Sequence, residues 1–109
     1  MNPLSTLRHR FYVPYPRLPT GELVELPGRG STYVTDTPGP SPDAPAVVLL
    51  HGLACTGLLN WFPAIEPLSR RFRVVTMDQR WHGQGIRSDR FSLTDCADDV
   101  VALADVLGL

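Results

Sequence analysis

The sequence of 109 residues contains no lysine, only two cysteines and no long apolar run. Its longest unbroken apolar stretches, such as Ala46–Leu50, have five residues, far short of the about 20 residues that a helix needs to cross a bilayer. The first 16 residues carry arginines but no apolar segment typical of a secretory signal. Cys55 and Cys96 are too few for a disulfide framework and lack the spacing of metal ligands. We therefore expect a cytoplasmic protein that does not span a membrane.

The charges are balanced along the chain. All 10 basic side chains are arginines, and they face 11 acidic ones. Residues 1–45 hold four of each sign, and residues 46–109 hold six arginines and seven acids. Neither half has the surplus that would attract a nucleic acid or an anionic membrane. With 43% hydrophobic and 19% charged residues, the composition is typical of a soluble globular protein that binds neither partner.

Proline is concentrated in the first part of the chain and rare after it. Nine of the 11 prolines lie at or before Pro45, which excludes long helices there. Two β-prone runs, Glu22–Leu26 and Ser31–Thr35, are separated by the turn sequence PGRG, and this pattern predicts a β-hairpin. We expect residues 36–45 to form a loop and residues 1–10 to form a tail.

From Ala46 onward the pattern predicts alternating strands and helices. Ala46–Leu50 and Phe72–Met77 are apolar runs typical of strands buried on both faces. A helix is expected over Trp61–Arg71, where Pro67 would break or kink it. A second helix is expected to begin at an N-cap provided by Ser92 or Thr94 and to stop at Gly108.

The last predicted helix has one apolar face, and its aspartates are expected mostly off that face. The apolar positions are Ala97, Val100, Val101, Ala104 and Leu107.

A strand, helix, strand and helix joined by short links form a βαβα unit, which implies a parallel sheet covered by helices. Ligands of such sheets bind beyond the carboxyl ends of the strands. The two loops there, His51–Asn60 and Asp78–Ser88, are therefore the candidate site.

Each of these loops offers a structural and a functional interpretation. The glycine after His51 can turn the backbone so that the next N–H, that of Leu53 or else of Ala54, points into the crevice and binds an oxyanion. In the second loop, Asp78, Arg80 and His82 lie within five residues of one another. They can form a hydrogen-bonded cluster that pins the loop, or they can contact substrate as an acid–base pair.

Taken together, these motifs resemble the N-terminal half of the α/β-hydrolase fold. They are a strand that ends in HG, Trp61 ten residues beyond His51, and the strand FRVVTMD followed by QRWHGQG. The family commonly carries D-x-R-G-H-G-x-S at the second loop. Trp81 replaces the first glycine of that motif, Gly85 replaces its serine, and the remaining motif residues match. The resemblance covers residues 20–109, so we expect a partial α/β-hydrolase domain there and an N-terminal extension over residues 1–19.

The resemblance implies a three-layer αβα architecture and a role for each loop. Leu53 would lend its backbone N–H to an oxyanion hole, within a loop that His51 and Gly52 shape. The second-loop residues would have structural or substrate-pocket roles; they are Asp78, Arg80, Trp81, His82 and Gly83. The resemblance implies no metal and no organic cofactor, and a small acyl compound as the substrate of the complete enzyme.

The nucleophile of the family is absent from this sequence. It sits in a G-x-S-x-G turn and is followed by an acid and a histidine, but none of the six serines and no aspartate has that setting. Cys55 comes nearest, yet the leading glycine is missing and it follows the wrong strand, so a buried or loop thiol is favoured. We therefore expect an N-terminal fragment that stops before the nucleophile strand, lacks the triad and is inactive alone.

Three functions remain open at this stage. The first is a serine-dependent hydrolase of esters or related acyl substrates, of which this chain is a part. The second is a non-catalytic fragment or an interaction module that uses an open sheet edge. The third keeps the fold but uses an aspartate nucleophile on epoxides or halides. The residue at the missing turn distinguishes the first from the third.

By the same resemblance, the missing strand would pair beside Ala46–Leu50 and leave that sheet edge open. Open apolar edges invite association with another chain. We therefore expect the 109-residue chain, expressed alone, to be poorly soluble or to self-associate. Size-exclusion chromatography tests this, and a sharp monomer peak would contradict it.

Overall fold

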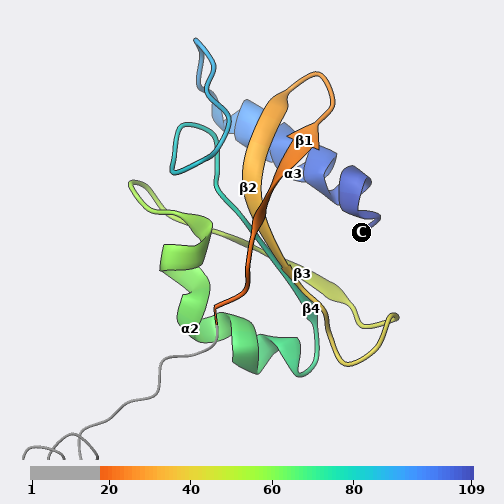
Figure 1. The fold of residues 1–109 in the computed structure, drawn as a ribbon. Helices are drawn as coiled ribbons and strands as arrows, with labels where there is room; N and C mark the ends of the chain where they lie inside the picture. The colour runs from red at the N-terminus through yellow and green to blue at the C-terminus, as the bar shows by residue number, and fades with distance from the viewer. Residues whose placement is uncertain (1–17) are drawn as a thin grey trace, which may run out of the picture.

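The computed structural model describes residues 18–109, which form a four-stranded mixed sheet with a helix on each face (Figure 1). The tail predicted for residues 1–10 and most of the predicted extension lie outside the described residues. In chain order the elements are β1 (Glu22–Leu26), β2 (Gly30–Thr37), β3 (Ala46–Leu50), α2 (Gly57–Ser69), β4 (Arg73–Met77) and α3 (Leu93–Leu107).

The predicted hairpin is confirmed. Strands β1 and β2 pair antiparallel around a turn in which Gly28 has a φ of +74° and the Arg29 N–H donates to the Leu26 carbonyl at 2.9 Å. Strand β2 is longer than expected and runs to Thr37, because its far end pairs antiparallel with β4. The hairpin is thereby joined to the rest of the sheet, in the order β1-β2-β4-β3.

The two strands expected in parallel are paired in that way, from Ala46 with Arg73 to Leu50 with Met77. Strand β4 lies between β2 and β3, and four of its five residues are buried. The expectation that β3 is buried on both faces is wrong, because Leu49 is its only buried residue. Among the described residues β3 has β4 as its single strand partner, so this edge of the sheet is partly exposed.

Helix α2 begins four residues earlier than predicted. Thr56 caps it, since its side chain accepts a hydrogen bond from the Leu59 N–H at 3.2 Å. The first predicted loop therefore shortens to residues 51–56. Both Pro63 and Pro67 lie inside the helix, where each removes a backbone donor. In Figure 1 the ribbon of α2 changes direction along its length, as proline within a helix favours.

The alternation of side chains along β4 divides the core into two clusters. Val74 packs with Leu49 and Ile65 under α2. Val75 and Met77 point to the opposite face and pack with Leu103 of α3 and other residues. This confirms the predicted three-layer αβα arrangement. Neither described helix is long and apolar enough to cross a bilayer, and the cytoplasmic location stays a prediction.

Helix α3 begins and ends as the sequence predicts. The Ser92 hydroxyl accepts a hydrogen bond from the Asp95 N–H at 3.0 Å, and Gly108 ends the helix with a left-handed φ of +69°. The expectation that the aspartates avoid the buried face is wrong for two of them. Asp95 and Asp99 are both buried, because arginines from other elements neutralise them.

The Asp99 carboxylate, 1% exposed, joins three parts of the fold. Arg80 donates to both of its oxygens from the loop after β4, through Nε at 3.0 Å and Nη2 at 2.9 Å. Arg29 donates to Oδ1 from the hairpin turn at 2.7 Å. The bond with Asp99 raises the pKa of Arg80 above its ordinary value. The network therefore fixes the second candidate loop and the hairpin to α3.

Replacing Ser92 tests the N-cap of α3. The Ser92 hydroxyl also donates to Asp95 and, with Arg90, lowers the pKa of that carboxyl. Ser92→Ala is expected to lower the free energy of unfolding by about 1 kcal/mol at pH 7. A carboxyl with a lowered pKa stabilises the fold above its ordinary pKa and ceases to do so in acid, so the loss shrinks at pH 3. Urea unfolding measures both values.

Thr94→Ala is the matched control, since Thr94 is exposed inside the first turn of α3. We expect its unfolding free energy to stay within about 0.5 kcal/mol of the parent value. An equal loss in both variants would contradict the assignment of Ser92 as the cap.

Asp99→Asn tests the buried ion pairs. The substitution leaves the Arg80 guanidinium buried without a countercharge, which costs about 3–5 kcal/mol. Asp98→Asn is the matched control, because it makes the same replacement at the exposed neighbouring aspartate. It is expected to change the free energy of unfolding by less than about 0.5 kcal/mol. Thermal unfolding followed by circular dichroism compares the two variants. Equal midpoints for both would contradict a structural role for the network.

Candidate functional site

The candidate site lies at the carboxyl ends of β3 and β4. The loop over residues 51–56 follows β3, and the loop over residues 78–92 follows β4. Because the two strands are parallel neighbours, their following loops emerge at the same edge of the sheet. This is the edge at which open α/β sheets bind ligands.

His51 is buried and bridges the two loops. Its Nε2 lies 2.9 Å from the Gln79 backbone nitrogen, and its Nδ1 lies 2.7 Å from the Gly52 carbonyl oxygen. A backbone N–H can only donate and a carbonyl can only accept, so Nδ1 carries the proton and Nε2 accepts. This arrangement requires the neutral ring. Both ring nitrogens are thus engaged with backbone, and His51 has a structural place in the site.

Leu53 presents a free backbone donor at the end of β3. The residue is 91% exposed, and within residues 18–109 its N–H donates to no acceptor. The preceding Gly52 N–H is held by the Asn60 side-chain oxygen at 3.0 Å, and the following Ala54 has a left-handed φ of +58°. The backbone on both sides of Leu53 is therefore in a defined conformation, which a fixed oxyanion donor requires.

Asp78 joins the second loop to the start of α2. Its carboxylate accepts hydrogen bonds from the Gly57 N–H and from the Gln84 N–H, both at 2.9 Å. Gly57 is the first residue of α2, so the negative charge also lies at the positive end of the helix dipole. The side chain is buried. Asp78 is thus placed to fix the relative positions of the two loops.

The expected cluster of Asp78, Arg80 and His82 does not form. Arg80 turns toward α3, where it binds Asp99, and its Nη1 donates to Ser88 at 3.0 Å. His82 instead hydrogen-bonds the Arg80 carbonyl through Nδ1 at 3.0 Å. The cluster fails because the guanidinium has a buried carboxylate partner within reach on α3, whereas Asp78 is already satisfied by backbone donors.

His82 is nevertheless close to the first loop. Its ring meets the ring of His51 edge to face, with 5.0 Å between the centroids. Of the residues that the sequence singles out, the structure therefore brings together His51 and His82, with Gly52 and Leu53 directly after His51 in the first loop. Asp78 contacts the start of α2. Arg80 lies in the same loop as His82, and its bond to Asp99 fixes that loop to α3.

The second loop has two left-handed residues with different consequences. Gly83 has a φ of +49°, and a Cβ there would clash with the Asp78 carboxylate, so this position requires glycine. Trp81 has a φ of +70°, which costs a residue with a Cβ about 1–2 kcal/mol. Its ring is half exposed and meets Phe91 edge to face, at 6.5 Å between centroids.

Several residues that hold the site were not singled out from the sequence. Gln79 and Asn60 each bind the first loop, and Asp99 anchors the second. The Thr56 cap could have indicated Asn60, because a helix that begins at Gly57 places Asn60 in its first turn. For Gln79 and Asp99 no local signal exists, since their partners lie 28 and 19 residues away.

The chemistry available in residues 18–109 is stabilisation of negative charge. The described part holds a free, positioned N–H at Leu53, but no histidine ring there hydrogen-bonds a serine, threonine or cysteine side chain. The Cys96 thiol has a pKa raised by burial and by Asp99, so it is a poor nucleophile. Residues 18–109 thus hold a backbone donor suited to an oxyanion, and no activated nucleophile is found among them.

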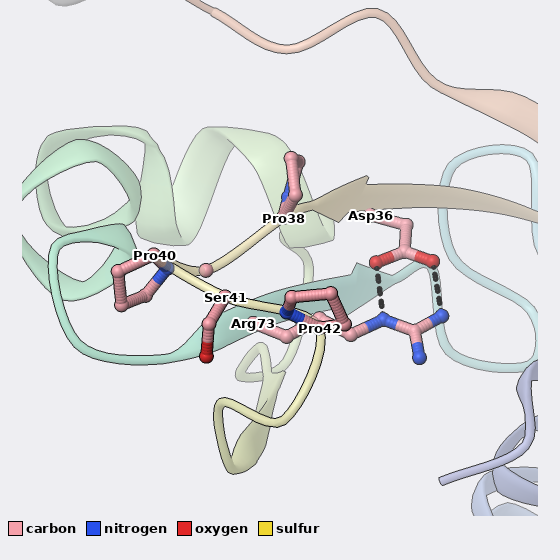
Figure 2. A pocket seen from close by; sticks show the side chains of 7 residues that line it. Asp36, Pro38, Pro40, Ser41, Pro42 and Arg73 are labelled. Atoms are coloured by element: carbon pink, nitrogen blue, oxygen red, sulfur yellow. Dashed lines mark hydrogen bonds and ion pairs between the residues drawn. The ribbon is translucent and has the colours of Figure 1, made fainter.

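A hollow of about 550 Å³ lies at the other end of the sheet, near the start of β4 (Figure 2). Its lining comprises Asp36, Pro38, Gly39, Pro40, Ser41, Pro42 and Arg73. Arg73 donates to both oxygens of Asp36, at 2.9 and 2.7 Å, and the bond raises the pKa of Arg73. The two charges in the hollow satisfy each other, and they lie far along the sheet from the candidate site.

Comparison with known proteins assigns the fold to a family. A profile described as the alpha/beta hydrolase fold matches residues 45–109, which include both candidate loops, β3, β4 and both helices. Because the match covers more than half of the chain, it identifies the family rather than a shared motif.

Similar proteins agree with this assignment. The chain is 40% identical to "Putative carbamate hydrolase RutD" of Caulobacter sp. strain K31 over 73 residues, which are 65% of this chain and 27% of the relative. It is 33% identical to 3-oxoadipate enol-lactonase 1 of Acinetobacter baylyi over 81 residues, 74% of this chain and 30% of the relative.

Solved structures give the same result. Epoxide hydrolases from metagenomes of hot environments superpose with a TM-score of 0.70 and 29% identity, over 84% of this chain and 31% of theirs. The chain thus spans less than a third of the length of these proteins. The profile match shows that the chain belongs to the alpha/beta hydrolase fold family, and the relatives and the superposition agree with it.

Proposed function

We propose that the chain forms the oxyanion loop and its sheet scaffold in a hydrolase that uses a serine nucleophile on esters or related acyl substrates. The observation that carries this proposal is the free backbone N–H of Leu53, held beside Gly52 at the end of β3. When a nucleophile adds to an acyl carbon, the carbonyl electron pair moves to oxygen. A fixed N–H that donates to this oxygen stabilises the transition state.

The names of two relatives support the acyl substrate class. A lactone is a cyclic ester, and a carbamate also has an acyl carbonyl, so the enol-lactonase and RutD are named for reactions at such a carbon. The nucleophile, its histidine and its acid come from outside these 109 residues in this proposal, because no serine here has glycines at the two required positions. The 109-residue chain alone is therefore inactive.

A second candidate is hydrolysis of an epoxide by an aspartate nucleophile. The similarity to epoxide hydrolases favours it, and the described residues suit either reaction. The residue at the nucleophile turn separates the two, serine for acyl substrates and aspartate for epoxides. The remaining alternative is an interaction module without catalysis. Such a module would bind a partner at the edge of β3 that has no strand partner among the described residues.

Two substitutions of Leu53 test the oxyanion role, in the protein translated from the complete reading frame that contains these residues. Leu53→Pro removes the N–H, whereas Leu53→Ala keeps it and removes only the exposed side chain. With p-nitrophenyl acetate, Leu53→Pro is expected to lower kcat by about 10²–10³-fold. Leu53→Ala should stay within a few-fold of the parent enzyme, and circular dichroism checks that both fold.

Equal rates in the two variants would contradict the role of the Leu53 N–H. In the same assay, the isolated 109-residue chain should hydrolyse p-nitrophenyl acetate no faster than buffer without protein. Turnover clearly above buffer would show that the nucleophile lies within these residues and would overturn that part of the proposal. An aspartate in place of serine at the nucleophile turn would favour the epoxide reaction.

A further inference from the structure

Gln79 holds the first candidate loop to the second through both its backbone and its side chain. Its backbone N–H donates to His51 Nε2 at 2.9 Å, and its side-chain amide donates to the His51 carbonyl oxygen at 2.5 Å. Gln79 occupies the position between Asp78 and Arg80, which the pattern D-x-R-G-H-G-x-S leaves open. We call these two hydrogen bonds from Gln79 to His51 the clamp.

The clamp acts where the sheet can no longer hold the loop. The regular pairing of β3 with β4 ends at Leu50 and Met77. Directly beyond it, Gln79 supplies the contacts between the diverging chains. A further hydrogen bond at the start of the loop runs from the Gly52 N–H to the Asn60 side-chain oxygen, and Asn60 belongs to α2 instead of the sheet.

The effect of the clamp reaches the residue before Leu53. Because Gln79 donates to Nε2, the His51 proton must lie on Nδ1, which donates to the Gly52 carbonyl at 2.7 Å. The carbonyl of Gly52 belongs to the same peptide unit as the Leu53 N–H, so orienting one orients the other. A chain of contacts thus runs from Gln79 through His51 to the proposed oxyanion donor.

We infer that Gln79 is a positioning residue, which sets the orientation of the Leu53 N–H by clamping His51. The importance of that N–H rests on the proposed function, whereas the clamp itself does not. The side-chain bond is the part of the clamp that a substitution can remove, because the backbone N–H of residue 79 remains in every variant except proline.

Hydrogen–deuterium exchange with mass spectrometry tests the inference in the protein translated from the complete reading frame that contains these residues. Gln79→Met keeps the length of the side chain and removes its donor. Exchange in peptides that cover residues 50–55 is expected to become about tenfold faster, as for the loss of one hydrogen bond. Exchange in peptides from β2 should not change. Gln84→Met is the matched control, because Gln84 lies in the same loop, is exposed, and bonds Asp78 through its backbone alone.

Three results would overturn the inference: unchanged exchange over residues 50–55, an equal increase in Gln84→Met, or a uniform increase that includes β2. The last would mean that Gln79 contributes only to overall stability. If Gln79→Met fails to fold, Gln79→Asn provides the same comparison, since its shorter amide cannot reach the His51 carbonyl. No ester is used, so this result and that of the Leu53 variants can fail independently.

Discussion

The bidentate pair between Arg80 and Asp99 is the interaction on which the arrangement of the site depends. A buried carboxylate is costly unless it is neutralised and hydrogen-bonded, and Asp99 meets both conditions with Arg80 and Arg29. The three residues come from three separate elements, so satisfying one charge fixes a hairpin, a loop and a helix. Arg80 is then engaged by α3, and the free donor described at the loop after β3 is the backbone N–H of Leu53.

The parts of the fold with local causes were predictable. The hairpin follows from its turn residues, β4 from an apolar run, and the ends of α3 from Ser92 and Gly108. The start of α2 was missed because Thr56 is followed by no acidic residue that would complete a capping box. The apolar run alone predicted β3 to be buried on both faces, because such a run does not reveal how many strands pair with it, whereas the resemblance implied the open edge at which β3 lies.

For the site, the sequence indicated the loops and the Leu53 donor but not the contacts that hold them. Asp78, Arg80 and His82 are neighbours along the chain, which suggested one cluster. In space each has a different partner: the start of α2, the buried Asp99 and the backbone of Arg80. Proximity in sequence does not determine pairing when a buried opposite charge lies on another element. The sequence shows that Trp81 stands where the family commonly has glycine. It does not show that Trp81 keeps the left-handed conformation, which the structure places at a φ of +70°.

The bond between Arg29 and Asp99 spans 70 residues, and this separation has a consequence for synthesis of the chain. At about 5–20 residues per second, roughly 4–14 s pass between the appearance of the two side chains during translation. Throughout that interval the hairpin turn exists without the carboxylate that anchors it. A two-stranded hairpin is only marginally stable in water by itself. Its strands therefore gain a partner when β4 has been made, and its turn is anchored only when α3 follows.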